Sequence, residues 1–258
     1  MTLFRNGFRG VSLVLSLLVL SSPAVGQVDQ RETERPPSAG QSEASASTNA
    51  EAAPTSINAG FIEPQLNLDE WIDRFEGESR EVFVSRAAVV EALRIQPEQR
   101  VADVGAGTGF FARLFAEQAN WVYAVDISPR FIEHNRDVAQ TLGLANLTPV
   151  LCTARSIDLP EASVDLVFVC DTYHHFEYFT DTLASIHRAL RPGGRLVIID
   201  FERIPGESRE WILGHVRAGK ETVIDEICEA GFELTREIPM ATFEENYFLI
   251  FTRPAVAE

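Results

Sequence analysis

Glycines occupy every second position of one short segment, at Gly105, Gly107 and Gly109. The segment follows an apolar stretch that ends at Val104 and precedes a helical pattern that begins at Phe110. Glycine adopts positive φ and lets other groups approach the backbone closely. This spacing therefore predicts a tight turn between a strand and a helix N-terminus, where a small ligand can lie against the chain. The dinucleotide fingerprint requires a further glycine where Phe110 stands, so the pattern disfavours a nicotinamide cofactor. A glycine turn in some other α/β protein is the alternative.

Two acids accompany the turn. Asp103 comes two residues before the first glycine, and Asp126 ends a second apolar stretch, about 20 residues beyond the turn. A carboxylate accepts hydrogen bonds and donates none, so Asp126 suits the two hydroxyls of a ribose and rejects a 2′-phosphate. Ser128 and Pro129 follow, so capping of the next helix is the alternative role for Asp126.

Histidines follow another apolar stretch, 165–170, at a position where ligands of open α/β sheets bind. With an ordinary pKa near neutrality, His174 or His175 can take a proton from a protic nucleophile, and helix capping or packing is the alternative. Adjacent residues of a regular backbone point in different directions, so we expect only one of the two to act. Tyr173 is a candidate for lining the pocket, and secondary candidates are His215 and Lys220. The five histidines lack the spacing of a metal site along the chain, so we expect no metal.

The patterns around these residues alternate between strands and helices, which predicts a parallel sheet. The expected strands are 100–104, 121–126, 147–152, 165–170, 195–200, 232–238 and 247–252. The expected helices are 69–76, 79–93, one from 110 onward, 129–142, 180–190 and 220–230.

Composition limits the class of protein. The chain has 258 residues and a net charge of −16 at pH 7, and we see no cluster of Lys and Arg, which argues against a nucleic-acid partner. Residues 1–26 carry a basic start, a short apolar core and small residues before a cleavage point, as in a secretory signal. Residues 27–60 are rich in small and polar residues and predict a disordered tether before a domain at 61–258. We therefore expect an exported protein, periplasmic or secreted, with no stable membrane insertion after cleavage. An uncleaved membrane anchor is the alternative.

The pattern Asp-x-Gly-x-Gly-x-Gly at 103–109 resembles motif I of the class I S-adenosylmethionine (SAM) dependent methyltransferases. Residues 157–175 and 188–200 are similar to later segments of that family, so the resemblance extends over nearly all of 61–258. It is strongest to the methyltransferase type 11 group, which includes ubiquinone/menaquinone-type and sterol-type enzymes. The resemblance implies an α/β, Rossmann-like sheet of seven strands in the order 3-2-1-4-5-7-6, with the last strand antiparallel and helices on both faces.

The resemblance also implies SAM as cofactor and a small molecule as methyl acceptor, while the acceptor and the oligomeric state stay open. The implied cofactor residues are Asp103, Gly105, Ala106, Gly107, Thr108, Gly109, Asp126, Ile127, Ala154, Arg155 and Asp171. Where the family usually has an acid for adenine, this chain has Thr153 to Ser156, so backbone groups near Ala154 and Arg155 are expected to replace it. In the family the helices at 69–93 cap the cofactor. In the family's strand order Cys152 and Cys170 lie roughly 14 Å apart, too far for a disulfide.

Two function classes remain. The first is an enzyme that methylates a small molecule. The second is an exported, noncatalytic protein that binds SAM or a nucleoside, because SAM is made in the cytoplasm and an exported chain has no evident supply.

Overall fold

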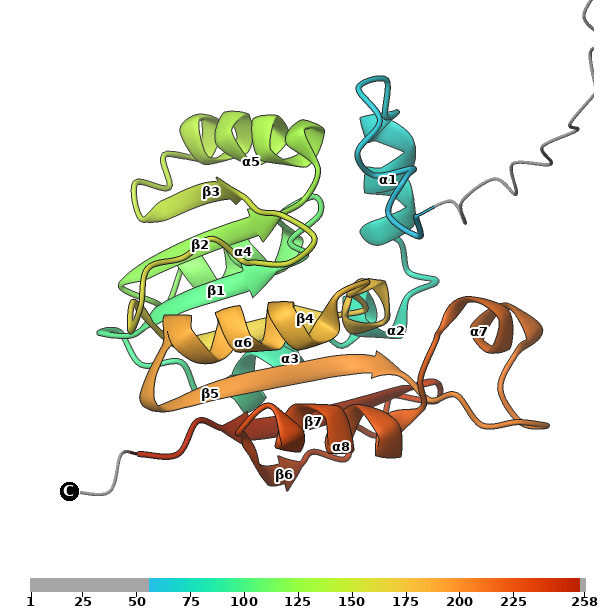
Figure 1. Cartoon of the computed structure of the whole chain (residues 1–258). Coiled ribbons are helices and arrows are strands. Elements are labelled where there is room, and N and C mark those ends of the chain that lie inside the picture. Colours follow the sequence, from blue (N-terminus) through green and yellow to red (C-terminus); the bar gives the residue numbers. More distant parts are fainter. Residues whose placement is uncertain (1–55, 256–258) are drawn as a thin grey trace, which may run out of the picture. The chain divides into compact units, whose positions relative to one another are not determined.

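The computed structural model describes residues 56–255, which contain a seven-stranded sheet in the order β3-β2-β1-β4-β5-β7-β6 (Figure 1). This is the predicted order. β7 pairs antiparallel with both β5 and β6, and the other strand pairs are parallel. The strands are β1 (Arg100–Val104), β2 (Trp121–Asp126), β3 (Leu147–Leu151), β4 (Val164–Cys170), β5 (Leu190–Phe201), β6 (Glu233–Glu237) and β7 (Asn246–Thr252).

Both faces of the sheet are apolar, because successive side chains of a strand point to opposite sides. In β1, Val101 packs into one hydrophobic cluster, whereas Ala102 and Val104 pack into the other. The first cluster contains side chains of α3 (Arg86–Leu93), α4 (Phe110–Ala116) and α5 (Pro129–Leu142). The second contains side chains of α6 (Phe179–Ala189) and α8 (Lys220–Glu229). The helices therefore cover both faces, as predicted.

The remaining helices lie beyond the carboxyl ends of the parallel strands, toward which the arrowheads of Figure 1 point. They are α1 (Leu68–Phe75), α2 (Glu81–Val84), the 3-10 turn η1 (Tyr173–His175) and α7 (Glu210–His215). Ligands of open α/β sheets bind at this edge. These four elements are therefore placed to enclose a site.

Two of the expected elements differ from their predicted bounds by more than one residue at an end. The helix expected at 79–93 is divided at Ser85, whose hydroxyl forms a hydrogen bond of 2.5 Å with the hydroxyl of Thr242. β5 begins at Leu190, five residues earlier than expected, because the Pro-Gly-Gly turn is built into the strand. Gly193 takes a φ of 78° and donates its N–H to the carbonyl of Arg253 at 2.8 Å. β4 shifts register at the same level, between Val164 and Leu166.

The folded part begins before residue 61, where the tether was expected to end. Asn58 is buried, and its side-chain N–H groups donate to the His175 carbonyl at 3.0 Å and to the Glu177 carboxylate at 3.3 Å. The predicted signal segment and most of the predicted tether lie outside the described residues. Within residues 56–255, none of the helices combines the length and the apolar character needed to cross a bilayer.

Candidate active site

The glycine turn after β1 is held from both sides at Gly107. Its N–H donates to the Asp126 carboxylate at 2.8 Å, and its carbonyl accepts from the Asn135 amide at 2.8 Å. Asp126 ends β2, and Asn135 lies on α5, so two neighbouring elements fix one peptide unit. All three glycines adopt positive φ, of 74°, 53° and 73°.

The three glycines meet different neighbours. A Cβ on Gly105 would lie 2.2 Å from Thr172 Cγ2, and one on Gly109 would lie 1.6 Å from Asn135 Oδ1. The protein's own packing therefore requires glycine at both positions. A Cβ on Gly107 would meet only the ring of Phe75, at 3.1 Å. Gly107 is thus the glycine that faces α1 and the cavity rather than the core.

Asp103 carries an unusual carboxylate in the last-but-one position of β1. It is buried, and its Oδ2 has no hydrogen-bond partner among the residues that the structure describes. Burial raises the pKa of Asp103 to about 7. The residue lines a cavity of about 1010 Å³ together with Gly105 and Gly107. A buried carboxylate with an unpartnered oxygen, on a residue that lines a cavity, fits a cationic or hydrogen-bond-donating group of a ligand.

A second, smaller cavity of about 100 Å³ lies on the other side of the turn. Asp126 lines it, and the wall around it is apolar, with Ile127, Phe131 and Ala154. Burial raises the pKa of Asp126 to about 6, although the N–H groups of Ser128 and Gly107 oppose this shift. The two cavities share Gly105 and Gly107, so a ligand lying along the turn can reach both.

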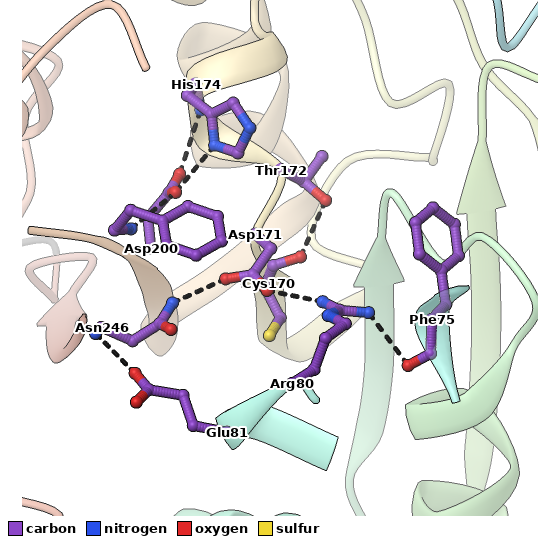
Figure 2. A network of polar contacts seen from close by, with 10 residues as sticks. Phe75, Arg80, Glu81, Cys170, Asp171, Thr172, His174, Asp200 and Asn246 are labelled. Atoms are coloured by element: carbon purple, nitrogen blue, oxygen red, sulfur yellow. Dashed lines mark hydrogen bonds and ion pairs between the residues drawn. The ribbon is translucent and has the colours of Figure 1, made fainter. Parts of the chain in front are cut away.

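A polar network joins α2 to the ends of β4 and β7 (Figure 2). The Asp171 carboxylate accepts from Arg80 at 2.5 Å and from the Asn246 side chain at 2.7 Å. Burial lowers the pKa of Arg80, but the charge and hydrogen bond of Asp171 together with Cys170 outweigh burial, so the pKa is raised overall. Glu81 accepts the backbone N–H of Asn246 at 2.6 Å. Asp171 itself has a φ of 48°, an unfavourable value for a residue other than glycine, so the network holds a strained position beside the cavity.

Both residues of the predicted histidine pair line the larger cavity, because η1 is a 3-10 turn rather than a regular helix. His174 Nδ1 lies 2.7 Å from Asp200 Oδ1. Figure 2 shows this contact as a dashed line. Burial lowers the pKa of His174, but Asp200 outweighs it and the pKa is raised overall. Burial, together with the neighbouring imidazoles of His174 and His215, lowers the pKa of His175 to about 3. His175 is therefore a neutral imidazole at physiological pH, and His174 is the residue of the pair that an acid holds.

Of the secondary candidates, only His215 lies with the pair. Its Nε2 is 3.4 Å from Nε2 of His175, and it lines the same cavity. Lys220 instead forms ion pairs with Glu202 at 2.7 Å and Glu237 at 3.0 Å, and it lines neither cavity.

Two predicted site residues point elsewhere. Tyr173 is buried in the core, where its hydroxyl donates to Glu226 at 2.8 Å, and it lines neither cavity. Burial and the Glu226 charge raise the pKa of Tyr173, so its hydroxyl stays protonated. The exposed Arg155 side chain pairs with Asp181 and stacks on the ring of Tyr178, 3.4 Å from its centroid. Ala154, by contrast, does line the smaller cavity.

Among the site residues that sequence reasoning overlooked are Arg80, Asn135 and Asp200. Asp200 had a usable signal, because an acid that ends an apolar strand is the pattern that singled out Asp126. Arg80, at the N-cap of α2, and Asn135, on α5, had none, since each stands among other polar residues and gains its role only by contact with a distant segment.

The strand order and the Asp-x-Gly-x-Gly-x-Gly turn after β1 are those of the class I SAM-dependent methyltransferases, so the chain has the fold of this class. Residues 102–198 match the family model described as a methyltransferase domain. The ubiquinone/menaquinone biosynthesis C-methyltransferase UbiE of Cupriavidus metallidurans is 32% identical over 119 residues. These make up 45% of this chain and 48% of that protein, so the chain spans about half the length of this curated relative.

Solved structures share the fold. A SAM-dependent methyltransferase of Aquifex aeolicus has a TM-score of 0.63 and 21% identity, covering 72% of this chain and 98% of the other. Phosphoethanolamine N-methyltransferase 2 of Haemonchus contortus, solved in complex with SAM, has a TM-score of 0.63 and 17% identity. That likeness covers 78% of this chain and 60% of the other. The comparisons support SAM as the cofactor.

The residues of the turn fit this cofactor. The Asp103 oxygen that has no partner among the described residues suits the positively charged methionine part, and Gly107 lines the same cavity as Asp103. Asp126 retains unused acceptor sites for ribose hydroxyls, since each of its oxygens receives one backbone N–H. Ile127 and Ala154 offer an apolar wall to adenine.

Proposed function

We propose that this protein transfers the methyl group of SAM to a small-molecule nucleophile. The observation that carries the proposal is the buried Asp103 carboxylate, one oxygen of which has no partner among the described residues, on a residue that lines a cavity of about 1010 Å³ beside the glycine turn. The buried carboxylate is costly to the fold on its own, and a cationic ligand on the turn removes that cost. The volume is at the upper end of the range of small-molecule sites, so cofactor and acceptor fit together.

The chain's own contribution is alignment. SAM supplies an electrophilic methyl carbon on a positively charged sulfur, which leaves as a neutral group, so catalysis requires mainly that the acceptor atom be held in line with it. Asp103 and the Gly107 peptide hold one end of the cofactor, and Asp126 holds the ribose. The aromatic rings of Phe61, Trp71 and Phe75 cover this region and exclude water from it.

The part of the cavity that remains for the acceptor is aromatic and contains imidazole groups. Phe201 and Trp211 line it together with His174, His175 and His215. Such a wall favours a flat, largely apolar acceptor. The matched relative is named a ubiquinone/menaquinone biosynthesis C-methyltransferase, so quinones and phenols are the first acceptors to test.

Two measurements test the proposal. Isothermal titration should show SAM and S-adenosylhomocysteine binding to the full chain, and NAD should not bind. Transfer of radiolabelled methyl groups from SAM should then be measured on a panel of phenols, quinones, amines and thiols. Absence of SAM binding would overturn the proposal. Tight SAM binding with no transfer to any acceptor class would instead support the noncatalytic binding protein.

A further inference from the structure

We infer that His174, His175 and His215, here called the histidine cluster, form a binding site for a divalent transition-metal ion, with Zn²⁺ as the best chemical match. One ring nitrogen of each residue lies within 4.8 Å of those of the other two. The expectation of no metal rested on spacing along the chain. The fold removes that argument, because α7 brings His215 next to a pair that precedes it by 40 residues.

The separation of two ring nitrogens matches the edge of a tetrahedral site. Two nitrogens at about 2.0–2.1 Å from a zinc ion, at the tetrahedral angle, lie about 3.3 Å apart. The Nε2 atoms of His175 and His215 lie 3.4 Å apart. An ion can therefore bind between these two imidazoles with little movement of either ring. The third nitrogen, within 4.8 Å, requires a modest rotation toward the ion.

Residues behind the ligands hold their rings in place. Asp200 accepts from the backbone N–H of His174 at 3.0 Å and lies 2.7 Å from its Nδ1, which leaves Nε2 of His174 for the ion. A carboxylate behind a ligating imidazole is a usual arrangement at zinc sites, because it fixes the ring and its tautomer. The ring of His215 stacks on Trp211, with centroids 4.7 Å apart and planes inclined by 24°.

The cluster also has an open side. All three histidines line the cavity that contains the glycine turn. Three protein ligands with a free fourth position is the arrangement of catalytic rather than structural zinc sites. A metal ion held there would bind an oxygen, nitrogen or sulfur atom of a molecule in the cavity. Metal binding itself does not depend on the proposed methyl transfer.

Cobalt and zinc titrations test this inference on the full chain after removal of metal by dialysis against EDTA. We expect one Co²⁺ per chain, with the visible absorption bands of a tetrahedral site, and displacement of Co²⁺ by Zn²⁺. His215→Gln should abolish these bands and weaken Zn²⁺ binding at least 100-fold. Asp200→Asn, which changes a positioning residue, should weaken it about 10- to 100-fold. His187→Gln, on α6 and outside the cluster, is the matched control and should bind as the wild type does.

Thermal unfolding of each variant checks that the loss of binding is not loss of fold, and His215 suits this test because it is only partly buried at the end of α7. Unchanged metal binding in a folded His215→Gln variant would overturn the inference, as would absence of Co²⁺ bands in the wild type. In that second case the short contact between His175 and His215 is an ordinary imidazole hydrogen bond. SAM titration of the metal-free chain is a separate measurement, so failure of the metal site and failure of the proposed function are distinguishable.

Discussion

At the scale of single residues, the ionised Asp103 carboxylate destabilises the cofactor-free fold but is expected to favour binding of the proposed cofactor. Its carboxylate is buried with one oxygen unpartnered, so ionisation is unfavourable in the cofactor-free fold. The folded-state pKa, about 7, lies above the ordinary value of 3.8. The folded state therefore binds the proton more tightly than the unfolded chain. The destabilisation that Asp103 causes grows as the pH rises from about 4 to about 7.

We predict that Asp103→Asn raises the melting temperature of the cofactor-free protein at pH 8 more than at pH 5, because asparagine carries no charge to bury. The same variant should bind SAM about 10- to 100-fold more weakly, since it loses a charged partner. Thermal unfolding at the two pH values and isothermal titration check these outcomes. An equal gain in melting temperature at both pH values would contradict the burial argument. Unchanged SAM affinity would contradict the assigned role.

At the scale of elements, some glycines of the turn are required by the packing of the fold, and Gly107 is expected to matter mainly for cofactor binding. We predict that Gly105→Ala and Gly109→Ala strongly lower the stability of the fold, because their Cβ atoms would overlap Thr172 and Asn135. Gly107→Ala should cost only about 1–2 kcal/mol, the usual cost of positive φ, while it weakens SAM binding. Chemical denaturation and SAM titration measure the two effects.

Gly143→Ala is the matched control for the turn. Gly143 has a φ of 68° with no atom within 4 Å of its Cβ position among the described residues, so this variant isolates the cost of positive φ. The free energy of unfolding should fall more in Gly105→Ala and Gly109→Ala than in Gly143→Ala. Equal or smaller losses of stability at the turn would show that packing does not select glycine there.

The link between α2 and the end of β4 depends on the pair of Arg80 and Asp171. We predict that Arg80→Met lowers the free energy of unfolding by about 2–4 kcal/mol, because Asp171 then remains buried without its cation. The double variant Arg80→Met, Asp171→Asn should recover part of this loss. Urea denaturation measures both.

Arg130→Met, which removes an exposed ion pair with Glu133, serves as the comparison for this pair and should change stability by less than about 0.5 kcal/mol. If Arg80→Met and Arg130→Met lowered the free energy of unfolding equally, the ion pair of Arg80 and Asp171 would not be the link between α2 and the end of β4.

At the scale of the whole molecule, the predicted signal segment at residues 1–26 leads to a proposal about location. We propose that the mature chain begins near Gln27 and lies outside the cytoplasmic membrane, on the basis of the basic start, apolar core and Ala-Val-Gly ending of residues 1–26. Mass spectrometry of the native protein from fractionated cells should find that N-terminus. An intact N-terminus in the cytoplasmic fraction would refute export and remove the question of how SAM reaches the protein.

The positions of most strands and the glycine turn could be predicted from the sequence, because each depends on a pattern within a few adjacent residues. The strand order and the covering of both sheet faces, by contrast, were implied by the resemblance to a known family. Apolar stretches that end at Val104 and Asp126 mark β1 and β2 wherever the rest of the chain lies. Positive φ at Gly107 likewise follows from residue type and neighbours. The predicted start of β5 was wrong, since the Pro-Gly-Gly turn is accommodated inside the strand by pairing with Arg253 and by a register shift in β4.

The sequence by itself determined the class of protein and the ends of the strands at which its site lies. Only the tertiary structure decided which polar side chains meet there. Asn135 reaches Gly107 from 28 residues away, and His215 reaches His175 from 40 residues away. Tyr173, adjacent to His174 in the sequence, turns into the core instead. The physical reason is that a backbone pattern repeats over short distances and is visible locally. The partner of a buried polar group, by contrast, is set by which distant elements the closed sheet and its helices bring within hydrogen-bond range.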